Sequence, residues 1–174
     1  MDTRPAPAVR AAAATDAPRI AEIYNQGIAE RGATFETAPR TAADMARRLA
    51  GPAAAARHPT LVVEHAGAVA GWAAITEYRP RPCYGGIGEF SIYLDRASRG
   101  HGLGRLLLEA LIREAARLGY WKLVSRIFPF NTASLALCRA CGFRVVGTYE
   151  KHGRLDGRWL DVVIVERLIP ENQP

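Results

Sequence analysis

The chain has 174 residues, 49% of them hydrophobic, and a formal net charge of +6. This length supports one globular domain with a substantial core and is too short for two ordinary domains. No apolar run approaches the ~20 residues that span a bilayer, and the first residues lack the pattern of an export signal, so we expect a cytoplasmic protein with no membrane partner. Most of the basic residues are arginines, which fits either an anionic ligand or an ordinary solvated surface.

The three cysteines are an odd number, which argues against a disulfide framework. Cys138 and Cys141 form a C-x-x-C pair, but they fall late in a predicted helix, where the helix dipole disfavours a thiolate. The remaining cysteine and the histidines show no second paired spacing that would complete a zinc site. We therefore expect neither a redox motif nor a metal site.

The first predicted elements are a strand and two helices. Residues 1–7 are rich in proline and alanine and are predicted to be a disordered N-terminus, and residues 9–12 form a possible short strand. A helix is predicted over residues 16–30, because a proline falls in its first turn and apolar residues recur at helical spacing. A second helix begins at Thr41 and ends at Gly51-Pro52.

Three predicted strands follow. Residues 61–64 and 68–77 form a hairpin around a turn in which glycine supplies the positive φ. A loop rich in proline and glycine, residues 79–86, precedes a strand over residues 87–94. Side chains of this last strand alternate between two faces, with Glu89, Ser91 and Tyr93 on one and Phe90, Ile92 and Leu94 on the other.

The second half of the chain begins with a long amphipathic helix and a strand over residues 121–128. A helix over residues 131–142 follows, and two final strands are predicted over residues 145–150 and 159–168. The order of elements predicts a single α/β (α+β) domain over residues 8–170, with a mixed, mostly antiparallel central sheet flanked by helices.

Three alternate glycines stand just before the long helix, in the stretch Arg99-Gly100-His101-Gly102-Leu103-Gly104. Glycine lets the backbone turn sharply and approach a ligand, and the N–H groups of the first helical turn carry a partial positive charge. We therefore expect an anion site that fits a pyrophosphate. A dinucleotide fingerprint is excluded because Arg105 replaces its third glycine, and a nucleoside-triphosphate loop is excluded because no G-K-[ST] follows.

The motif R-x-x-G-x-G of Arg99, Gly102 and Gly104, with a strand before it and a helix after it, resembles the GNAT superfamily of acetyl-coenzyme A dependent N-acetyltransferases. The later helix is also similar to the family pattern, with Asn131 and Ser134 near its start and a Gly-Phe pair at its end. The resemblance covers nearly the whole chain. It implies a GNAT-like fold, acetyl-coenzyme A as co-substrate and no metal.

The resemblance also implies three groups of cofactor-binding residues. The backbone of the strand before the loop would pair with the pantetheine arm, at Ile92, Tyr93 and Leu94. The loop would hold the pyrophosphate, at Arg99, Gly100, His101, Gly102, Leu103, Gly104 and Arg105. The start of the later helix would lie near the thioester, at Asn131 and Ser134. For His101 the alternative is a solvated loop tip.

Within the superfamily the closer likeness is to the phosphinothricin acetyltransferase group, which includes enzymes for methionine sulfoximine and arsinothricin. The residues that carry this likeness lie in separate stretches but follow the same order along the chain: Phe35, the Arg79-x-Arg81-x-x-Tyr84 loop, Glu89, Tyr93 and Gly157 to Val162. The likeness implies acetyl transfer to the α-amino group of a small glutamate-like amino acid. It also implies a homodimer and a role in antibiotic or herbicide resistance.

Glu89 is the predicted general base, because it stands in an otherwise apolar strand where burial would strengthen it as a base. The alternative is a glutamate that faces solvent. Arg79 and Arg81 can clamp a carboxylate or an anionic head of the substrate, or they are solvated loop arginines. Phe35 and Tyr84 can wall the amino-acid pocket, or they are ordinary core residues.

Cys138 departs from the family pattern. The phosphinothricin enzymes carry a histidine at this position, and many other members carry a tyrosine that protonates the coenzyme A thiolate. Cys138 can supply that proton, or it is a small hydrophobic residue in a buried helix face.

Two other functions stay open from the sequence. One is acetylation of another amine, such as a protein N-terminus, a polyamine or an aminoglycoside, although Arg79 and Arg81 disfavour polycations. The other is a non-catalytic coenzyme A-binding sensor, which would not need Glu89. A nucleic-acid partner is not expected, because arginines alternate with glutamates on the long helix and form no basic face.

Overall fold

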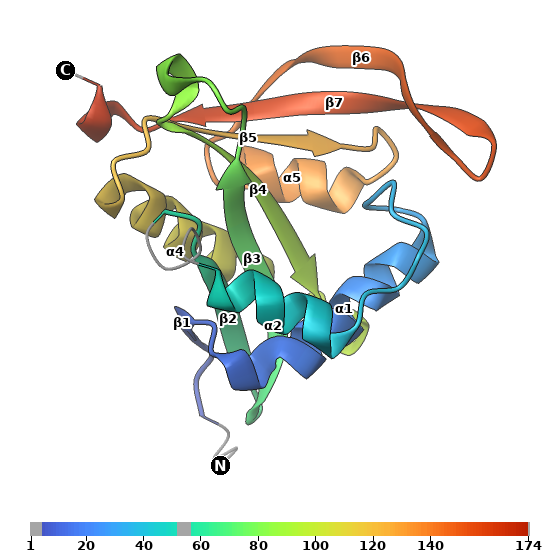
Figure 1. Cartoon of the computed structure of the whole chain (residues 1–174), viewed down its shortest axis with the longest axis vertical. Helices are drawn as coiled ribbons and strands as arrows, with labels where there is room; N and C mark the ends of the chain where they lie inside the picture. Colours follow the sequence, from blue (N-terminus) through green and yellow to red (C-terminus); the bar gives the residue numbers. More distant parts are fainter. Residues whose placement is uncertain (1–4, 52–56, 174) are drawn as a thin grey trace.

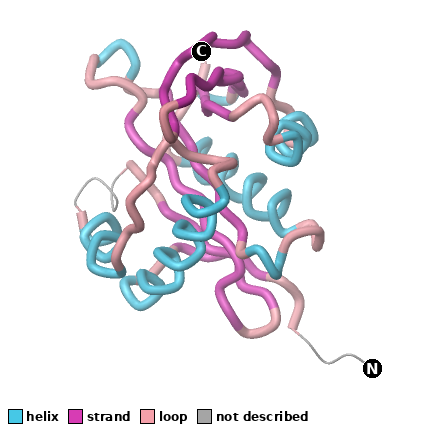
Figure 2. Tube along the Cα trace, turned by 90° about the vertical axis from the view of Figure 1, so that its right-hand side faces the viewer, coloured by secondary structure: helices cyan, strands magenta, loops and turns pink. Residues whose placement is uncertain are grey.

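A computed structural model of the chain describes residues 5–51 and 57–173 (Figure 1). Seven strands form one sheet in the order β1-β2-β3-β4-β5-β7-β6, and helices lie on both sides of it (Figure 2). The mixed, mostly antiparallel sheet predicted from the sequence is confirmed. The predicted disordered N-terminus, residues 1–7, falls partly on residues 1–4, which lie outside the described residues, as does Pro52 at the predicted end of the second helix.

The strands are β1 Ala8–Ala11, β2 Thr60–His65, β3 Ala68–Glu77, β4 Ile87–Leu94, β5 Lys122–Ile127, β6 Arg144–Leu155 and β7 Arg158–Leu168. The helices are α1 Ala17–Glu30, α2 Ala42–Ala50, α4 Leu103–Arg117 and α5 Thr132–Ala140. The predicted end of the strand at residue 150 is wrong for β6. That strand passes through an irregularity between Tyr149 and Gly153 and then pairs with β7 again, so the hairpin turn contains only Asp156 and Gly157.

The two faces of the sheet carry separate hydrophobic cores. The alternation predicted for β4 is confirmed, because Phe90 belongs to the same core as Leu107 and Leu111 of α4, whereas Tyr93 packs into the core beneath α1 and α2. Tyr93 stacks on Trp72 of β3, with 5.0 Å between ring centroids. Around β4, each face of the sheet is therefore shielded from water by its own helices, which holds β4 in place from both sides.

The centre of the sheet is split between β4 and β5. These strands pair in parallel only where Ile87 to Glu89 lie beside Lys122 to Val124, and beyond this point they diverge (Figure 1). The hydroxyl of Ser125 donates a hydrogen bond of 2.9 Å to the Phe90 carbonyl at the start of the divergence. The split leaves an opening in the middle of the sheet, where backbone groups of β4 have no strand partner on the β5 side.

An ion pair fastens β1 to the start of α1. Arg10 donates two hydrogen bonds to Asp16, of 2.6 and 2.9 Å, and the Ala13 backbone N–H donates a third of 2.7 Å. Asp16 is buried, and the hydrogen bonds from Arg10 lower the pKa of its carboxyl below the ordinary value. The carboxylate therefore holds together a strand, a turn and a helix at the edge of the sheet.

Asp16→Asn is expected to lower the free energy of unfolding by about 2 kcal/mol at neutral pH, because it removes charged hydrogen bonds to a buried group. Since the pKa of Asp16 is lower in the folded than in the unfolded chain, the contribution is complete above about pH 4 and is lost as the pH falls through the lowered pKa. Urea unfolding at neutral pH and in acid measures this difference, which is expected to shrink in acid.

Glu22→Gln is the control for Asp16→Asn, because Glu22 forms only an exposed pair with Arg19 on α1. This change is expected to alter the unfolding free energy by less than about 0.5 kcal/mol. An Asp16→Asn variant as stable as the wild type at neutral pH would contradict the structural role of the ion pair.

Candidate active site

Three cavities lie in a row through the split in the sheet. The loop groove, about 580 Å³, runs between the glycine-rich loop and α5. The split cavity, about 60 Å³, lies between β4 and β5, and the face cavity, about 390 Å³, lies over β4 to β7. Ile92 and Asn131 border both of the first two cavities, and Ser125 and Arg126 border both of the last two. A ligand in the loop groove can therefore meet a ligand in the face cavity.

The glycine-rich loop presents unpaired backbone N–H groups at the start of α4. Gly100 and Gly102 adopt φ values of +82° and +75°, which side chains other than glycine rarely take. Within the described part of the chain, the N–H groups of residues 100–105 donate to no acceptor. A Cβ on Gly104 would lie 3.3 Å from side-chain atoms of Leu94 and Leu137, so glycine lets α4 approach β4 and α5. These features fit a phosphate-bearing ligand.

Most of the residues predicted to bind the cofactor meet at the loop groove. Those that line it are Ile92, Tyr93, Leu94, Arg99, Gly100, Gly102, Gly104, Arg105, Asn131 and Ser134. Two of the predicted residues lie elsewhere, because the loop turns at His101 and α4 begins at Leu103. His101 is exposed, with Nδ1 3.3 Å from the Ser98 carbonyl oxygen, and Leu103 is buried in the core.

The two arginines of the loop groove already have carboxylate partners. Arg99 and Arg96 both donate to Glu30 at the end of α1, at 2.9 and 2.8 Å, and Arg105 pairs with Glu109 at 2.7 Å. Burial acts to raise the pKa of Glu30, but the hydrogen bonds from Arg99 and Arg96 lower it overall. A phosphate at the loop would therefore share Arg99 with Glu30, or take it over.

Asn131 connects α5 to the segment that follows α1. Its Oδ1 accepts a hydrogen bond of 3.1 Å from the Ser134 backbone N–H, so Asn131 is the N-cap of α5. Its Nδ2 donates to the Gly32 carbonyl oxygen at 3.1 Å. Both ends of this amide are thus engaged within the protein, and the side chain fixes the wall shared by the loop groove and the split cavity.

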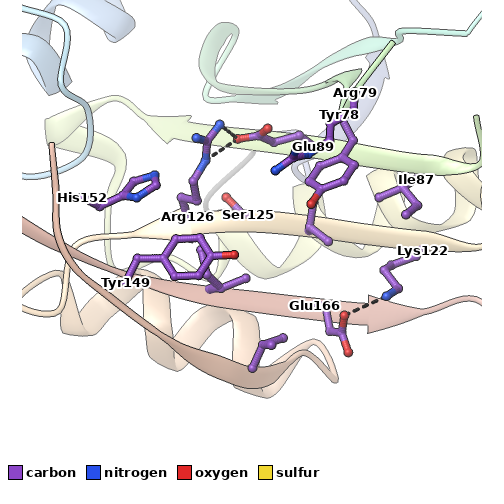
Figure 3. A pocket seen from close by; sticks show the side chains of 13 residues that line it. Tyr78, Arg79, Ile87, Glu89, Lys122, Ser125, Arg126, Tyr149, His152 and Glu166 are labelled. Carbon is purple, nitrogen blue, oxygen red and sulfur yellow. Dashed lines mark hydrogen bonds and ion pairs between the residues drawn. The ribbon is translucent and has the colours of Figure 1, made fainter. Parts of the chain in front are cut away.

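Glu89 lies at the inner end of the face cavity, beside the split, and forms an ion pair with Arg126 of β5 (Figure 3). Arg126 Nε donates to Oε1 of Glu89 at 2.9 Å, and Nη2 donates to the same oxygen. The apolar surroundings predicted for Glu89 are therefore wrong, because a cation from the neighbouring strand faces it. Within the described residues Oε2 accepts no hydrogen bond, so this oxygen is available to a ligand.

Only one of the four predicted substrate-binding residues lines the face cavity. This is Arg79, whose guanidinium lies 5.3 Å from the ring centroid of Tyr78. Tyr84 packs edge-on against the same ring of Tyr78, at 5.8 Å. Arg81 is exposed and does not line the face cavity, because the chain turns into a short 3-10 helix after it.

Phe35 packs under the β6–β7 hairpin and does not line any of the three cavities. It contacts Phe128 in a T-shaped arrangement, with 4.9 Å between centroids, and shares a small core with Leu155 and Val162. A Cβ on Gly153 would come within 2.7 Å of its ring. Phe35 therefore attaches the hairpin to the segment between α1 and α2.

Several residues of the face cavity were missed from the sequence. They come from the loop before β4, from β5, from β6 and from β7: Tyr78, Lys122, Arg126, Tyr149, His152 and Glu166. On β5 a signal was available, because the charged side chains at residues 122 and 126 stand on one face of the strand, while Leu123 and Ile127 stand on the other. For β6 the irregularity near Tyr149 decides which side chains face the cavity, and no local pattern predicts it.

Cys138 is buried and lines the split cavity. Burial raises the pKa of its thiol to about 12, so it is neutral at physiological pH. Burial also raises the pKa of Cys141, and both thiols are free. This pair therefore lacks the thiolate that a redox motif needs.

Two absences apply only to residues 5–51 and 57–173. No group of three or more His, Cys, Asp or Glu side chains is placed to hold a metal ion there. None of the helices found in that part of the chain combines the length and the apolar composition needed to cross a membrane.

A split sheet that joins an anion-binding loop to a second cavity is the arrangement of a two-substrate transferase. The family profile described as "Acetyltransferase (GNAT) domain" matches residues 9–164. The chain therefore belongs to the GNAT acetyltransferases, and the resemblance seen in the sequence is confirmed.

Named relatives give a narrower comparison. The chain is 37% identical to an L-methionine sulfoximine/L-methionine sulfone acetyltransferase of Pseudomonas paraeruginosa, over 91% of this chain and 92% of that protein. It is 36% identical to a phosphinothricin N-acetyltransferase of Alcaligenes faecalis, over 91% and 81% of the two chains. A GNAT superfamily phosphinothricin acetyltransferase of Sinorhizobium meliloti, solved in complex with acetyl-coenzyme A, superimposes with a TM-score of 0.88 at 34% identity, over 96% and 90%.

Proposed function

We propose that this enzyme transfers the acetyl group of acetyl-coenzyme A to the α-amino group of a small glutamate-like amino acid, of the phosphinothricin, methionine sulfoximine or arsinothricin type. The observation that carries the proposal is that the split cavity shares bordering residues with both the loop groove and the face cavity, and that Glu89 lines the face cavity beside the split. The names of the relatives, whose matched regions cover most of this chain, support the substrate class.

The loop groove is the place for the acetyl donor. Acetyl-coenzyme A, when bound, supplies the acetyl group as a thioester. The unpaired N–H groups of residues 100–105 fit its pyrophosphate, with Arg99 beside them. The Phe90 carbonyl faces β5, so by the alternation of a strand Ile92 presents its N–H and C=O to the same open side. The N–H of Ile92 is thus the nearest backbone donor for an oxyanion formed in the split.

Glu89 is the proposed general base. Its Oε1 is held by Arg126, and its Oε2 is directed to accept a hydrogen bond from the α-ammonium of the substrate, directly or through a water molecule. Removal of a proton leaves the neutral amine, which attacks the thioester carbonyl. Arg126 keeps the carboxylate in one orientation while the amine approaches.

The charges of the face cavity favour an amino acid over a polyamine or an aminoglycoside. Three cationic side chains, Arg79, Lys122 and Arg126, line it against two carboxylates, Glu89 and Glu166. We propose that Arg79 pairs with the α-carboxylate of the substrate. Among the other predicted residues, Tyr84 supports the wall through Tyr78, Phe35 supports it through the hairpin, and Arg81 is exposed and does not line the cavity.

Cys138 remains the thiol nearest to the departing thiolate, but its environment argues against proton donation. Burial raises its pKa to about 12, above the ~8.5 of an ordinary thiol, so proton transfer to a thiolate would be uphill. We propose that Cys138 mainly fills the wall of the split cavity and that the departing thiolate takes up the proton that the attacking nitrogen loses as the amide forms.

We propose that the protein is a homodimer, that it is located in the cytoplasm, and that it confers resistance to inhibitory amino acids. Large apolar side chains that are about half exposed support the dimer, and they lie on β6 and β7 outside the face cavity, at Val145, Trp159 and Leu168. A patch of this kind is typical of an interface between identical subunits. Analytical ultracentrifugation of the purified protein measures the oligomeric state, and a monomer at micromolar concentration would contradict the proposal.

Release of free thiol from acetyl-coenzyme A is expected with phosphinothricin and methionine sulfoximine, and much less with polyamines. Glu89→Gln is expected to lower kcat by about 100-fold or more, because it removes the proton acceptor. The binding of coenzyme A, measured by calorimetry, is expected to stay unchanged, since Glu89 does not line the loop groove. Absence of turnover with every amine would refute the enzyme function, and full turnover by Glu89→Gln would exclude Glu89 as the base.

Cys138→Ala is expected to retain turnover within about threefold of the wild type, because a thiol this weakly acidic is a poor proton donor. The same thiol-release assay measures it. A loss of about 100-fold in kcat, with an unchanged melting temperature, would instead identify Cys138 as the donor.

A further inference from the structure

The outer end of the face cavity holds a second charged cluster, away from Glu89. Lys122 of β5 donates to Oε2 of Glu166 on β7 at 2.9 Å, and Arg144 of β6 donates to Oε1. Figure 3 shows the contact between Lys122 and Glu166. Lys122 and Glu166 both line the cavity, with 26% and 11% of their side chains exposed. Burial acts to raise the pKa of Glu166, but the hydrogen bond from Lys122 lowers it overall, so the carboxylate stays charged.

The cluster carries an excess positive charge. Both oxygens of Glu166 are engaged, one by Lys122 and one by Arg144, and the two cations outnumber the single carboxylate. Lys122 uses one of its three donors on Glu166, and within the described residues the other two have no acceptor. The ammonium can therefore bind an anion in the cavity while Glu166 holds it in position.

Lysine is rare in this chain, which makes its position informative. Lys122 and Lys151 are the two lysines among 23 basic residues. A partly buried ion pair adds little stability by itself, because desolvation offsets the attraction between the charges. The lysine ammonium carries three donors on one compact charge, so Lys122 can hold Glu166 and still bind a second anion.

The strand register sets the spacing between this cluster and Glu89. Ile87 lies beside Lys122, and Glu89 lies beside Val124. The backbone position of Lys122 is therefore two residues, about 7 Å along the strands, from the position that pairs with Glu89. An apolar floor of Ile87, Val124, Val146 and Ile164 lines the same cavity. An amino acid with two methylenes between its α-carbon and its head spans about 5 Å from the α-nitrogen to the head atom. With a hydrogen bond of about 3 Å at each end, an extended substrate would join charged groups about 11 Å apart, and a bent one would join groups that are closer.

We propose that Lys122, positioned by Glu166, binds the oxyanion head of the substrate side chain, such as a phosphinate or a carboxylate, and thereby determines substrate specificity. This inference rests on the proposed function, since Glu89 marks the amine end of the substrate. The methylenes then lie on the apolar floor, and Arg79 is left for the α-carboxylate.

The test compares Lys122→Met with Lys151→Met, the other lysine, which is exposed on β6 and lines none of the three cavities. With phosphinothricin, Lys122→Met is expected to raise KM by about 10-fold to 100-fold and to change kcat by less than about threefold, because a charged hydrogen bond to the head is lost. With methionine, whose head is neutral and apolar, KM is expected to stay the same or to fall. Lys151→Met is expected to match the wild type with both substrates.

Lys122→Arg keeps the charge and the contact with Glu166, so it is expected to recover most of the affinity for phosphinothricin. This variant shows whether a loss in Lys122→Met comes from the missing charge or from misfolding. An equal rise in KM for phosphinothricin and methionine would indicate a merely structural role for Lys122 and overturn the inference. An unchanged KM for phosphinothricin in Lys122→Met would overturn it as well.

Equilibrium binding separates this inference from the proposed function. Calorimetry with phosphinothricin alone, without acetyl-coenzyme A, is expected to give an affinity at least about tenfold weaker for Lys122→Met than for the wild type. Equal affinities would overturn the role of Lys122. A wild type that binds phosphinothricin through Lys122 but acetylates no amine would refute the proposed function and support the head-group site.

Discussion

The divergence of β4 from β5 is the constraint on which the rest of this structure depends. Two paired strands would close the sheet with backbone hydrogen bonds, but pairing stops after Glu89 and Val124. The hydroxyl of Ser125 satisfies the Phe90 carbonyl at the point of separation, and the β4 backbone beyond it faces the opening. The sheet is therefore open at its centre, and the split cavity in this opening borders both the loop groove and the face cavity.

The packing on each side keeps the opening in one shape. Tyr93 is stacked on Trp72 beneath α1 and α2, while Phe90 is buried against α4, so β4 cannot move to either face without losing apolar contacts. Asn131 fixes the start of α5 against Gly32 across the same opening. The walls are thus held by side chains from both halves of the chain, which suits a site that must place two reacting groups within contact distance.

Charge divides the face cavity into two ends joined by an apolar floor. The Glu89–Arg126 pair stands at the split, and the Lys122–Glu166 pair stands at the outer end. Each pair contributes one side chain from β5, on alternate positions of a single strand face. Cross-strand pairing therefore sets both the chemistry and the spacing of the cavity, and the β6–β7 hairpin, attached through Phe35, covers its open side.

The sequence by itself predicted the elements, the sheet type and the glycine-rich loop, because hydrophobic periodicity, helix ends and positive-φ glycines are local signals. It also placed Asn131 near the start of α5 and Glu89 within β4. Only the tertiary structure decided that Arg126 pairs with Glu89, that Lys122 and Glu166 share the cavity, and that Phe35 lies outside it. These contacts join residues 37 to 93 positions apart, and their geometry depends on strand order, on the split and on a β6 irregularity, none of which has a local pattern.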